Sequence, residues 1–388
     1  MTKSTVPPDR AFDDSPFVVF YETTQACDLV CAHCRACAQT MSHPGELGPG
    51  QALALLDDLR RFPAPPLVVL TGGDPMKRAD IHDLVAHGTS IGLSMAMTPS
   101  ATPLVTHDAL ARLKGNGLAR LAVSLDGAGA SSHDGLRGVA GSYRRTLEIL
   151  NDAAGLGLSL QVNTTVHVGN VDELPAIVDQ IEAFGLDLWS VFFLVPVGRA
   201  LATSSIAPAR YEDVFEFLYA QSRSRSFAIK TTEAPHYRRY LLQRRKAERR
   251  GAAGVARADT PEVGAGARGP GMIGTNDGKG VLFVGHTGFV QPSGFLPLPC
   301  GRFPASSVVE VYQSHPLFVA LRDADRLGGK CGACEYRTLC GGSRARSYSV
   351  AGDALASEPD CIYVPPGWHA SQSEPVHAQD EAAAVATT

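Results

Sequence analysis

The sequence predicts an α/β fold built on a parallel β-sheet. Two observations support this prediction. Short apolar, β-branched runs alternate with longer amphipathic segments between residues 17 and 196, and polar residues stand where several of these runs end. Repeated βα units imply a parallel sheet covered by helices, either an open doubly wound sheet or a complete or partial barrel. The spacing alone does not distinguish these architectures.

Six runs have the composition of strands, and they lie at 17–23, 66–73, 91–98, 119–127, 158–166 and 188–196. Segments between them carry apolar residues at helical spacing, among them 50–62, 107–115, 142–157 and 171–185. Several of these segments end at a glycine, as helices often do. Polar groups at 27–37, 71–75, 124–127 and 163–165 all follow expected strands. We therefore expect them at the carboxyl edge of the sheet, where such folds bind ligands.

The pattern changes after residue 200. Segments 211–224 and 236–250 are expected to be helical, and 251–271 is a connector rich in Gly and Ala. Residues 280–295 predict a β-hairpin that turns around His286 to Gly288. The tail after Tyr363 is rich in Pro, Ala and acidic residues, and we expect it to be disordered.

Composition indicates a soluble globular protein. The chain has 388 residues, is 44% hydrophobic and carries a net charge of -4, which argues against a general nucleic-acid binder. The N-terminus lacks the apolar segment of a signal peptide, and the longest apolar run is too short to span a membrane. We therefore expect a cytoplasmic protein without membrane contact. Its nine cysteines should stay reduced there and serve as metal ligands or catalytic groups.

The first cysteine group has the pattern CxxxCxxC. It comprises Cys27, Cys31 and Cys34, with Cys37 close behind, on the loop after the first expected strand. A 4Fe-4S cluster held by only three thiolates has one iron open to another ligand. The alternative is a tetrahedral zinc site, which also uses closely spaced cysteines.

This pattern resembles that of the radical S-adenosylmethionine (radical SAM) enzymes. The resemblance implies that Cys27, Cys31 and Cys34 hold a cluster whose open iron is chelated by the amino and carboxylate groups of SAM. Reductive cleavage of SAM then releases a 5′-deoxyadenosyl radical. The sequence "TGGDP", with Gly72, Gly73, Asp74 and Pro75, resembles the GGEP motif that meets the SAM ammonium group, although Asp replaces Glu. Taken alone, it would be an ordinary turn.

Further SAM contacts are implied by the same resemblance. In "SLDGAGASSHDGLRG", Ser124 corresponds to the contact with the ribose and Arg137 to the contact with the SAM carboxylate. A guanidinium suits a carboxylate because it donates two parallel hydrogen bonds. The remaining implied contacts are Asn163, Thr165, Val195 through its backbone, and His33 beside the adenine. The alternatives are a surface ion pair for Arg137 and ordinary strand-end capping for the strand-end residues.

The second cysteine group contains Cys331, Cys334, Cys340 and Cys361. Four thiolates can close a 4Fe-4S cluster completely, which suits electron transfer. The group resembles the SPASM and Twitch extensions of radical SAM enzymes. It departs from the full SPASM pattern because Arg344 stands where a further cysteine would be, so we predict one auxiliary cluster. A zinc ribbon is the alternative. The two cysteines left over, Cys37 and Cys300, are most simply inert thiols.

The resemblance implies a partial (β/α)6 barrel of the TIM type, followed by a small cysteine-rich SPASM/Twitch-like domain that contains the β-hairpin. The expected divisions are a flexible N-terminus at 1–16, the radical SAM barrel at 17–225, a helical segment and connector at 226–280, the auxiliary cluster domain at 281–363 and a disordered tail at 364–388.

An auxiliary cluster can accept an electron from a substrate radical, so we predict an oxidoreductase. Related enzymes with one such cluster trim side chains of tetrapyrroles, which is the favoured substrate class. The arginines of 236–250, with Arg344 and Arg346, are candidates for binding its carboxylates, although a solvated helix face is the simpler interpretation.

Other candidates remain open. Glu233, His236 and Tyr237 are candidate residues of the substrate pocket, with His236 or Tyr237 as a proton donor. The expected electron donor is a protein such as flavodoxin or ferredoxin. A maturase acting on a ribosomal peptide is the alternative, and a non-catalytic iron-sulfur carrier or zinc protein is the alternative from another class.

Overall fold

The computed structural model describes residues 12–201, 204–252 and 274–369. The expectations for residues 1–11, for most of the connector and for residues 370–388 fall outside the described residues. Residues 12–16 were expected to be flexible, but they lie against the C-terminal part of the chain. Ser15 is buried, and the carbonyl of Phe12 accepts a hydrogen bond of 2.6 Å from the hydroxyl of Tyr312.

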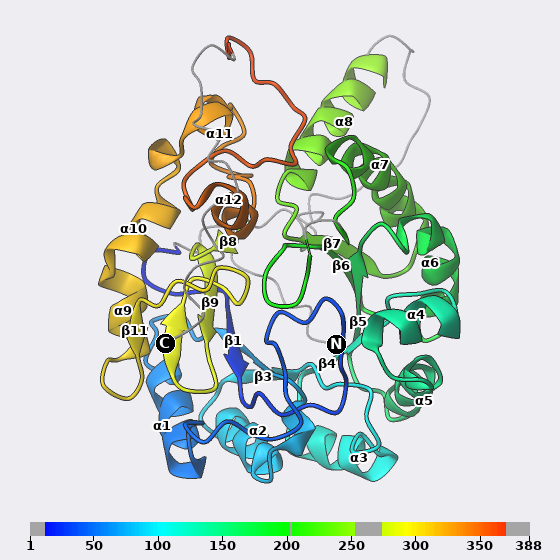
Figure 1. Ribbon diagram of the computed structural model, residues 1–388, viewed down its shortest axis with the longest axis vertical. Helices are drawn as coiled ribbons and strands as arrows, with labels where there is room; N and C mark the ends of the chain where they lie inside the picture. The colour runs from blue at the N-terminus through cyan, green and yellow to red at the C-terminus, as the bar shows by residue number, and fades with distance from the viewer. Residues whose placement is uncertain (1–11, 202–203, 253–273, 370–388) are drawn as a thin grey trace, which may run out of the picture.

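Seven parallel strands form the curved sheet at the centre of the molecule (Figure 1). They are β1 (Val18–Glu22), β2 (Leu67–Thr71), β3 (Ser94–Met97), β4 (Arg120–Ser124), β5 (Leu160–Val166), β6 (Leu188–Phe193) and β7 (Ala228–Thr232). Each pairs with the next in chain order, and the sheet is open rather than closed. The predicted α/β fold with a parallel sheet is thereby confirmed. Strand β7 lies in the segment 226–280, for which the sequence predicted a helix and a connector, so the parallel series continues beyond residue 225.

Helices cover the outer face of this sheet (Figure 1). They are α1 (Pro49–Arg60), α2 (Ile81–Ser90), α3 (His107–Gly115), α4 (Ala130–Arg137), α5 (Ser142–Gly155), α6 (Leu174–Glu182) and α7 (Pro208–Ser224). Alternate strand residues pack against them. On β6, for example, Trp189, Val191 and Phe193 belong to the main hydrophobic core. Burial of this outer face holds the helices in place, while the inner face is free to carry polar groups.

The C-terminal part of the chain is attached to the edge of the same sheet. Strand β9 (Gly280–Val284) pairs in parallel with β1, and β10 (Phe289–Gln291) pairs antiparallel with β9, which confirms the predicted hairpin. The other elements are α8 (Tyr237–Ala252), β8 (Asn276–Asp277), β11 (Gly301–Arg302), α9 (Val308–Ser314), α10 (Pro316–Arg322), α11 (Gly329–Ala333) and α12 (Arg344–Ala351). Short 3-10 turns lie at Pro75–Lys77, Val171–Glu173 and Ala324–Arg326. None of the helices in the described ranges is long and apolar enough to cross a membrane.

Candidate active site

The first cysteine group lies on the loop that follows β1, at the carboxyl edge of the sheet. Hydrogen bonds tie the two ends of this loop together: the backbone N–H of Cys27 donates to the carbonyl of Gln39 at 2.6 Å, and the N–H of Gln39 donates to the carbonyl of Gln25 at 3.0 Å. Cys27 and Cys31 are buried and Cys34 is half-buried, whereas Cys37 is exposed. The three residues of the motif are therefore the ones shielded from solvent.

Hydrogen-bond donors face the sulfur atoms of the motif. The backbone N–H of Leu29 lies 3.3 Å from Sγ of Cys27, and that of Ala38 lies 3.4 Å from Sγ of Cys34. A guanidinium nitrogen of Arg137 lies 3.9 Å from Sγ of Cys31. Such donors stabilise negatively charged sulfur, so the surroundings suit thiolate ligands.

A second loop, which follows β6, also holds the cysteine loop. After β6, the backbone N–H of Arg199 donates to the carbonyl of Cys34 at 3.0 Å, and its side chain donates to the carbonyls of Cys31 and Ala38 at 3.0 and 3.1 Å. Sequence analysis did not identify Arg199, because a lone arginine after a strand has no motif around it. Its three bonds make it a positioning residue for the cysteine loop.

The "TGGDP" motif packs directly against the cysteine loop. The N–H of Gly73 donates to the carbonyl of Thr24 at 2.9 Å, and that of Asp74 donates to the carbonyl of Ala26 at 2.7 Å. The Asp74 carboxylate is buried and accepts from the backbone of Met76 and, at 2.6 Å, from the hydroxyl of Thr102. These bonds hold the loop after β2 in shape, and they occupy the carboxylate for which a SAM contact was expected.

We expect Gly73→Ala to prevent normal cluster loading. A Cβ at Gly73 would lie 2.4 Å from the carbonyl oxygen of Ala26, so the cysteine loop would have to move. Gly50→Ala, on α1, is the matched control because a Cβ there meets nothing within 4 Å. Iron content after anaerobic reconstitution should fall toward about half in the first variant, because only the first cluster is affected, and stay unchanged in the second. Full iron content in Gly73→Ala would contradict this account.

Arg137 forms a buried ion pair rather than the surface pair considered as an alternative. Its Nε donates to Oδ2 of Asp126 at 2.8 Å, and Nη2 contacts the same oxygen. Burial alone would raise the pKa of the Asp126 carboxyl, but the charge of Arg137, together with the neighbouring histidines and the backbone N–H of Thr165, holds that pKa at about 2. The other Asp126 oxygen accepts from the backbone of Thr165 at 2.7 Å. Asp126, which is the aspartate of "SLDG", therefore joins the ends of β4 and β5, and sequence analysis gave it no role.

The remaining expected SAM contacts lie on neighbouring strands. Ser124 ends β4 and is paired directly with Asn163 on β5. Val195 follows β6 and is buried in a small core with residues of the C-terminal part. His33 lies within the cysteine loop, where burial lowers its pKa to about 4, and its Nδ1 has no partner among the described residues. The structure thus brings these residues to one edge, and their roles stay predictions.

The second cysteine group lines a single recess. Cys331, Cys334, Cys340 and Cys361 are all half-buried at its wall. The backbone N–H of Glu358 lies 3.3 Å from Sγ of Cys331, and the N–H of Gly342 lies 3.5 Å from Sγ of Cys340. Burial raises the pKa of the Cys340 thiol to about 12, so this thiol ionises readily only with a metal bound to it.

The structure corrects the suggestion that Arg344 and Arg346 bind substrate. Both are fully buried. Arg344 donates to the carbonyls of Ala354 and Ala356, with Nη2 at 3.9 Å from Sγ of Cys331. Sequence alone does not show such burial, because arginine usually lies at the surface.

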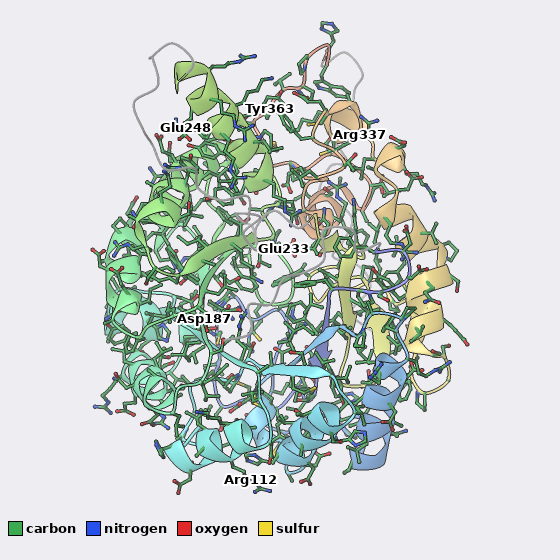
Figure 2. The ribbon with its side chains drawn as sticks, turned by 180° about the vertical axis from the view of Figure 1, so that it is seen from behind. Arg112, Asp187, Glu233, Glu248, Arg337 and Tyr363 are labelled. Atoms are coloured by element: carbon green, nitrogen blue, oxygen red, sulfur yellow. The ribbon has the colours of Figure 1, made fainter. Side chains whose placement is uncertain are left out.

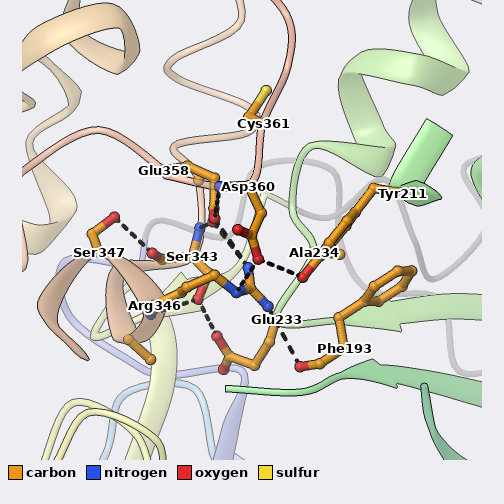
Figure 3. Close-up of polar contacts among 12 residues, drawn as sticks. Phe193, Tyr211, Glu233, Ala234, Ser343, Arg346, Ser347, Glu358, Asp360 and Cys361 are labelled. Atoms are coloured by element: carbon orange, nitrogen blue, oxygen red, sulfur yellow. Dashed lines mark hydrogen bonds and ion pairs between the residues drawn. The ribbon is translucent and has the colours of Figure 1, made fainter. Parts of the chain in front are cut away.

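Figure 3 shows Arg346 between the carboxylates of Glu358 and Asp360, each at 3.1 Å. It also donates to the carbonyl of Leu194 after β6 at 3.2 Å. Its charge is therefore compensated internally, and this network ties the cysteine-rich part to the barrel. In α8, the segment after Arg244 is mostly exposed, which agrees with a solvated helix face.

The three candidate pocket residues lie in different surroundings. Glu233 is half-buried, is labelled near the middle of the view in Figure 2, and accepts from the hydroxyl of Ser343 at 2.5 Å. Burial raises its pKa well above the usual value. His236 is buried against the rings of Tyr211 and Phe215, and neither ring nitrogen has a partner among the described residues. Tyr237 packs in the aromatic core between α7 and α8. A substrate role for Tyr237 has no support in this packing.

The two leftover cysteines differ. Cys37 is exposed, while Cys300 is half-buried against the main core, where burial raises the pKa of its thiol to about 12. A thiol with such a pKa is a poor nucleophile.

The donor sets suit iron-sulfur clusters. The first group's motif supplies three thiols and the second group supplies four. In both groups, backbone N–H groups face some of the sulfur atoms. Among the described residues, no three His, Cys, Asp or Glu side chains converge on the position of one metal ion. A cubane has an iron at each corner, so its thiolates need not converge on one point.

Comparison with known proteins identifies the family. The family model described as the Radical SAM superfamily matches residues 21–181. The chain is 39% identical over 360 residues to the AdoMet-dependent heme synthase of Nitratidesulfovibrio vulgaris, covering 91% of this chain and 94% of that protein. The chain belongs to the radical SAM superfamily. This radical SAM protein is also 34% identical to the AdoMet-dependent heme synthase of Methanosarcina barkeri, over 92% and 99% of the two chains.

More distant relatives act on peptides. The radical SAM protein is 28% identical to the PqqA peptide cyclase of Rhodopseudomonas palustris, over 90% and 88% of the two chains. The solved structure of Streptococcus suis SuiB bound to S-adenosylmethionine superposes with a TM-score of 0.68 at 16% identity, covering 90% and 78%. That likeness confirms the fold.

Membership of the superfamily confirms that the protein is an enzyme and that it uses SAM and a 4Fe-4S cluster. The non-catalytic carrier considered above is therefore not supported. A zinc site at the first cysteine group is not supported either, because the superfamily uses a 4Fe-4S cluster. The assignment of Cys27, Cys31 and Cys34 as the ligands stays a prediction.

Proposed function

We propose that this enzyme oxidatively removes carboxyl groups from the side chains of a tetrapyrrole. The observation that carries the proposal is the end-to-end similarity, at 34 to 39% identity, to proteins named AdoMet-dependent heme synthases. The peptide-modifying relative is less similar, at 28%.

The reaction balances as follows. A propionate side chain that loses one hydrogen atom, one electron and CO2 becomes a vinyl group. SAM with its cluster supplies the 5′-deoxyadenosyl radical that takes the hydrogen atom. The electron needs an acceptor, and we propose one auxiliary cluster at Cys331, Cys334, Cys340 and Cys361 for this task. Flavodoxin or ferredoxin is the proposed source of the electron for SAM cleavage.

Residues of this chain support such chemistry by shielding and linking the two cysteine groups. Arg199 and Arg137 hold the first loop, and Arg346 joins the second group to the loop after β6. Tyr211, on α7, donates to Asp360 at 2.7 Å, directly before Cys361. Both groups are therefore parts of one packed structure, which keeps their separation constant.

The test is a substrate comparison with the reconstituted enzyme under anaerobic conditions. We expect iron coproporphyrin III to accelerate formation of 5′-deoxyadenosine and to lose one CO2 and two hydrogen atoms per modified side chain, as mass spectrometry would show. In a parallel experiment, peptides encoded near the gene replace the tetrapyrrole. Acceleration by a peptide and not by any tetrapyrrole would replace this proposal with a peptide-modifying function.

A further inference from the structure

The inner face of the sheet carries a row of polar side chains that crosses four strands. Ser124 on β4 is paired with Asn163 on β5, Asn163 with Ser190 on β6, and Ser190 with Lys230 on β7. Directly paired residues point to the same face of a sheet. Trp189 and Ile229, which precede Ser190 and Lys230, belong to the outer core, so the row lies on the opposite, inner face.

Lys230 is the only charged member of this row. The contact of 3.3 Å between the hydroxyls of Ser190 and Thr232 confirms that neighbouring residues of β6 and β7 share this face. Throughout the described ranges, the amine of Lys230 has neither an ion pair nor a hydrogen bond to another residue. Burial, followed by the charges of Arg120 and Arg238, lowers its pKa to about 8.

The two charges that lower the pKa of Lys230 are both cationic, those of Arg120 and Arg238. Arg120 donates to the hydroxyl of Ser159, and Arg238 donates to the carbonyls of Leu339 and Thr275. Neither forms an ion pair with a carboxylate in the part of the chain that the structure describes. The carboxyl of Glu233, three residues after Lys230, is bonded to Ser343 and has a raised pKa. A group of neighbouring cations that form no ion pair among the described residues favours an anionic ligand.

An apolar contact lies beside this charge. Phe192, two residues after Ser190 and on the same face, has its ring centroid 6.4 Å from that of Phe295, which comes from the loop after β10. A flat macrocycle with carboxylate side chains presents both kinds of surface. The row also contains Ser124 and Asn163, for which SAM contacts are proposed, so an anion at Lys230 would lie in the same layer as SAM.

We propose that Lys230 binds a carboxylate of the substrate on the inner face of the sheet, beside the SAM site. This inference rests on the proposed function and names one residue that positions the tetrapyrrole. The amine would hold the carboxylate by a charge-assisted hydrogen bond, replacing the water that a half-buried cation otherwise binds.

The test measures equilibrium binding of iron coproporphyrin III by its change in absorbance. Lys230→Met should weaken binding by about tenfold to a hundredfold, and Lys230→Arg should restore most of the affinity. Lys246→Met, an exposed lysine on α8, is the matched control and should bind like the unchanged enzyme. The tetra-amide of the same tetrapyrrole, which has no carboxylates, should bind the unchanged enzyme and Lys230→Met equally.

SAM binding and iron content, which should be unchanged in Lys230→Met, show that the variant is folded. Undiminished binding of the carboxylate form by Lys230→Met would overturn the inference alone. Loss of SAM binding with tetrapyrrole binding intact would also overturn it, because the amine would then serve the SAM carboxylate. If the unchanged enzyme binds neither form of the tetrapyrrole, the proposed function itself fails.

Discussion

Replacing Cys27, Cys31 and Cys34 together by alanine is expected to abolish SAM cleavage and to halve the iron content, from about eight to about four atoms per chain. The three thiols line the loop after β1, and N–H groups face two of their sulfur atoms. Without them the open cluster has no ligands, whereas the four thiols of the second recess are untouched. Iron and sulfide analysis with an assay for 5′-deoxyadenosine measures both effects.

Cys37→Ala is the control for this experiment. Cys37 is the exposed cysteine of the same loop, so its removal should leave both the iron content and SAM cleavage unchanged. An iron content of about four in the unchanged enzyme would show that only one group holds a cluster, and the argument for oxidation by an auxiliary cluster would lose its basis. Iron that stays at about eight in the triple variant would place the ligands elsewhere.

Arg346→Met is expected to destabilise the protein by about 3 to 5 kcal/mol. The guanidinium is fully buried between Glu358 and Asp360. Burial alone would raise the pKa of Glu358, but the charge of Arg346, together with His236 and backbone hydrogen bonds, lowers that pKa. Removing the cation leaves two carboxylates in the interior without compensation. Urea denaturation followed by circular dichroism would measure the loss.

Two comparisons separate charge from packing. Arg337→Met removes a partly exposed ion pair with Asp325 at 2.9 Å and should cost at most about 1 kcal/mol. Combining Arg346→Met with Glu358→Gln and Asp360→Asn should recover much of the loss, because no unpaired charge then remains. If the triple variant is no more stable than Arg346→Met, packing rather than charge explains the effect.

The sequence predicted the parallel sheet well because its signals are local. All six expected strands are present, and on β6 every second residue, such as Trp189 and Val191, belongs to the outer core. Strand β7 was missed as part of the sheet because the run around Ile229 is short and is followed directly by polar residues. The hairpin was predicted, but its parallel pairing with β1 is a contact between distant segments that no local pattern encodes.

The candidate site was predictable only where short motifs carry it. The cysteine spacing and "TGGDP" identified two loops that the structure does bring together, through the bond between Asp74 and Ala26. Arg199 and Asp126 were not identified, since their roles arise from backbone carbonyls and a buried ion pair that exist only after folding. Arg346 was assigned to the substrate because sequence gives charge but not burial.

The hydrogen bond from Arg199 to the carbonyl of Cys31 also bears on when the cluster can be assembled during protein synthesis. These residues are 168 positions apart, and the pairing of β1 with β9 joins segments farther apart still. During synthesis on the ribosome, the cysteine loop emerges long before the residues that hold it. The loop therefore reaches its held conformation only late in translation, and iron inserted into that conformation must arrive after most of the chain has been made.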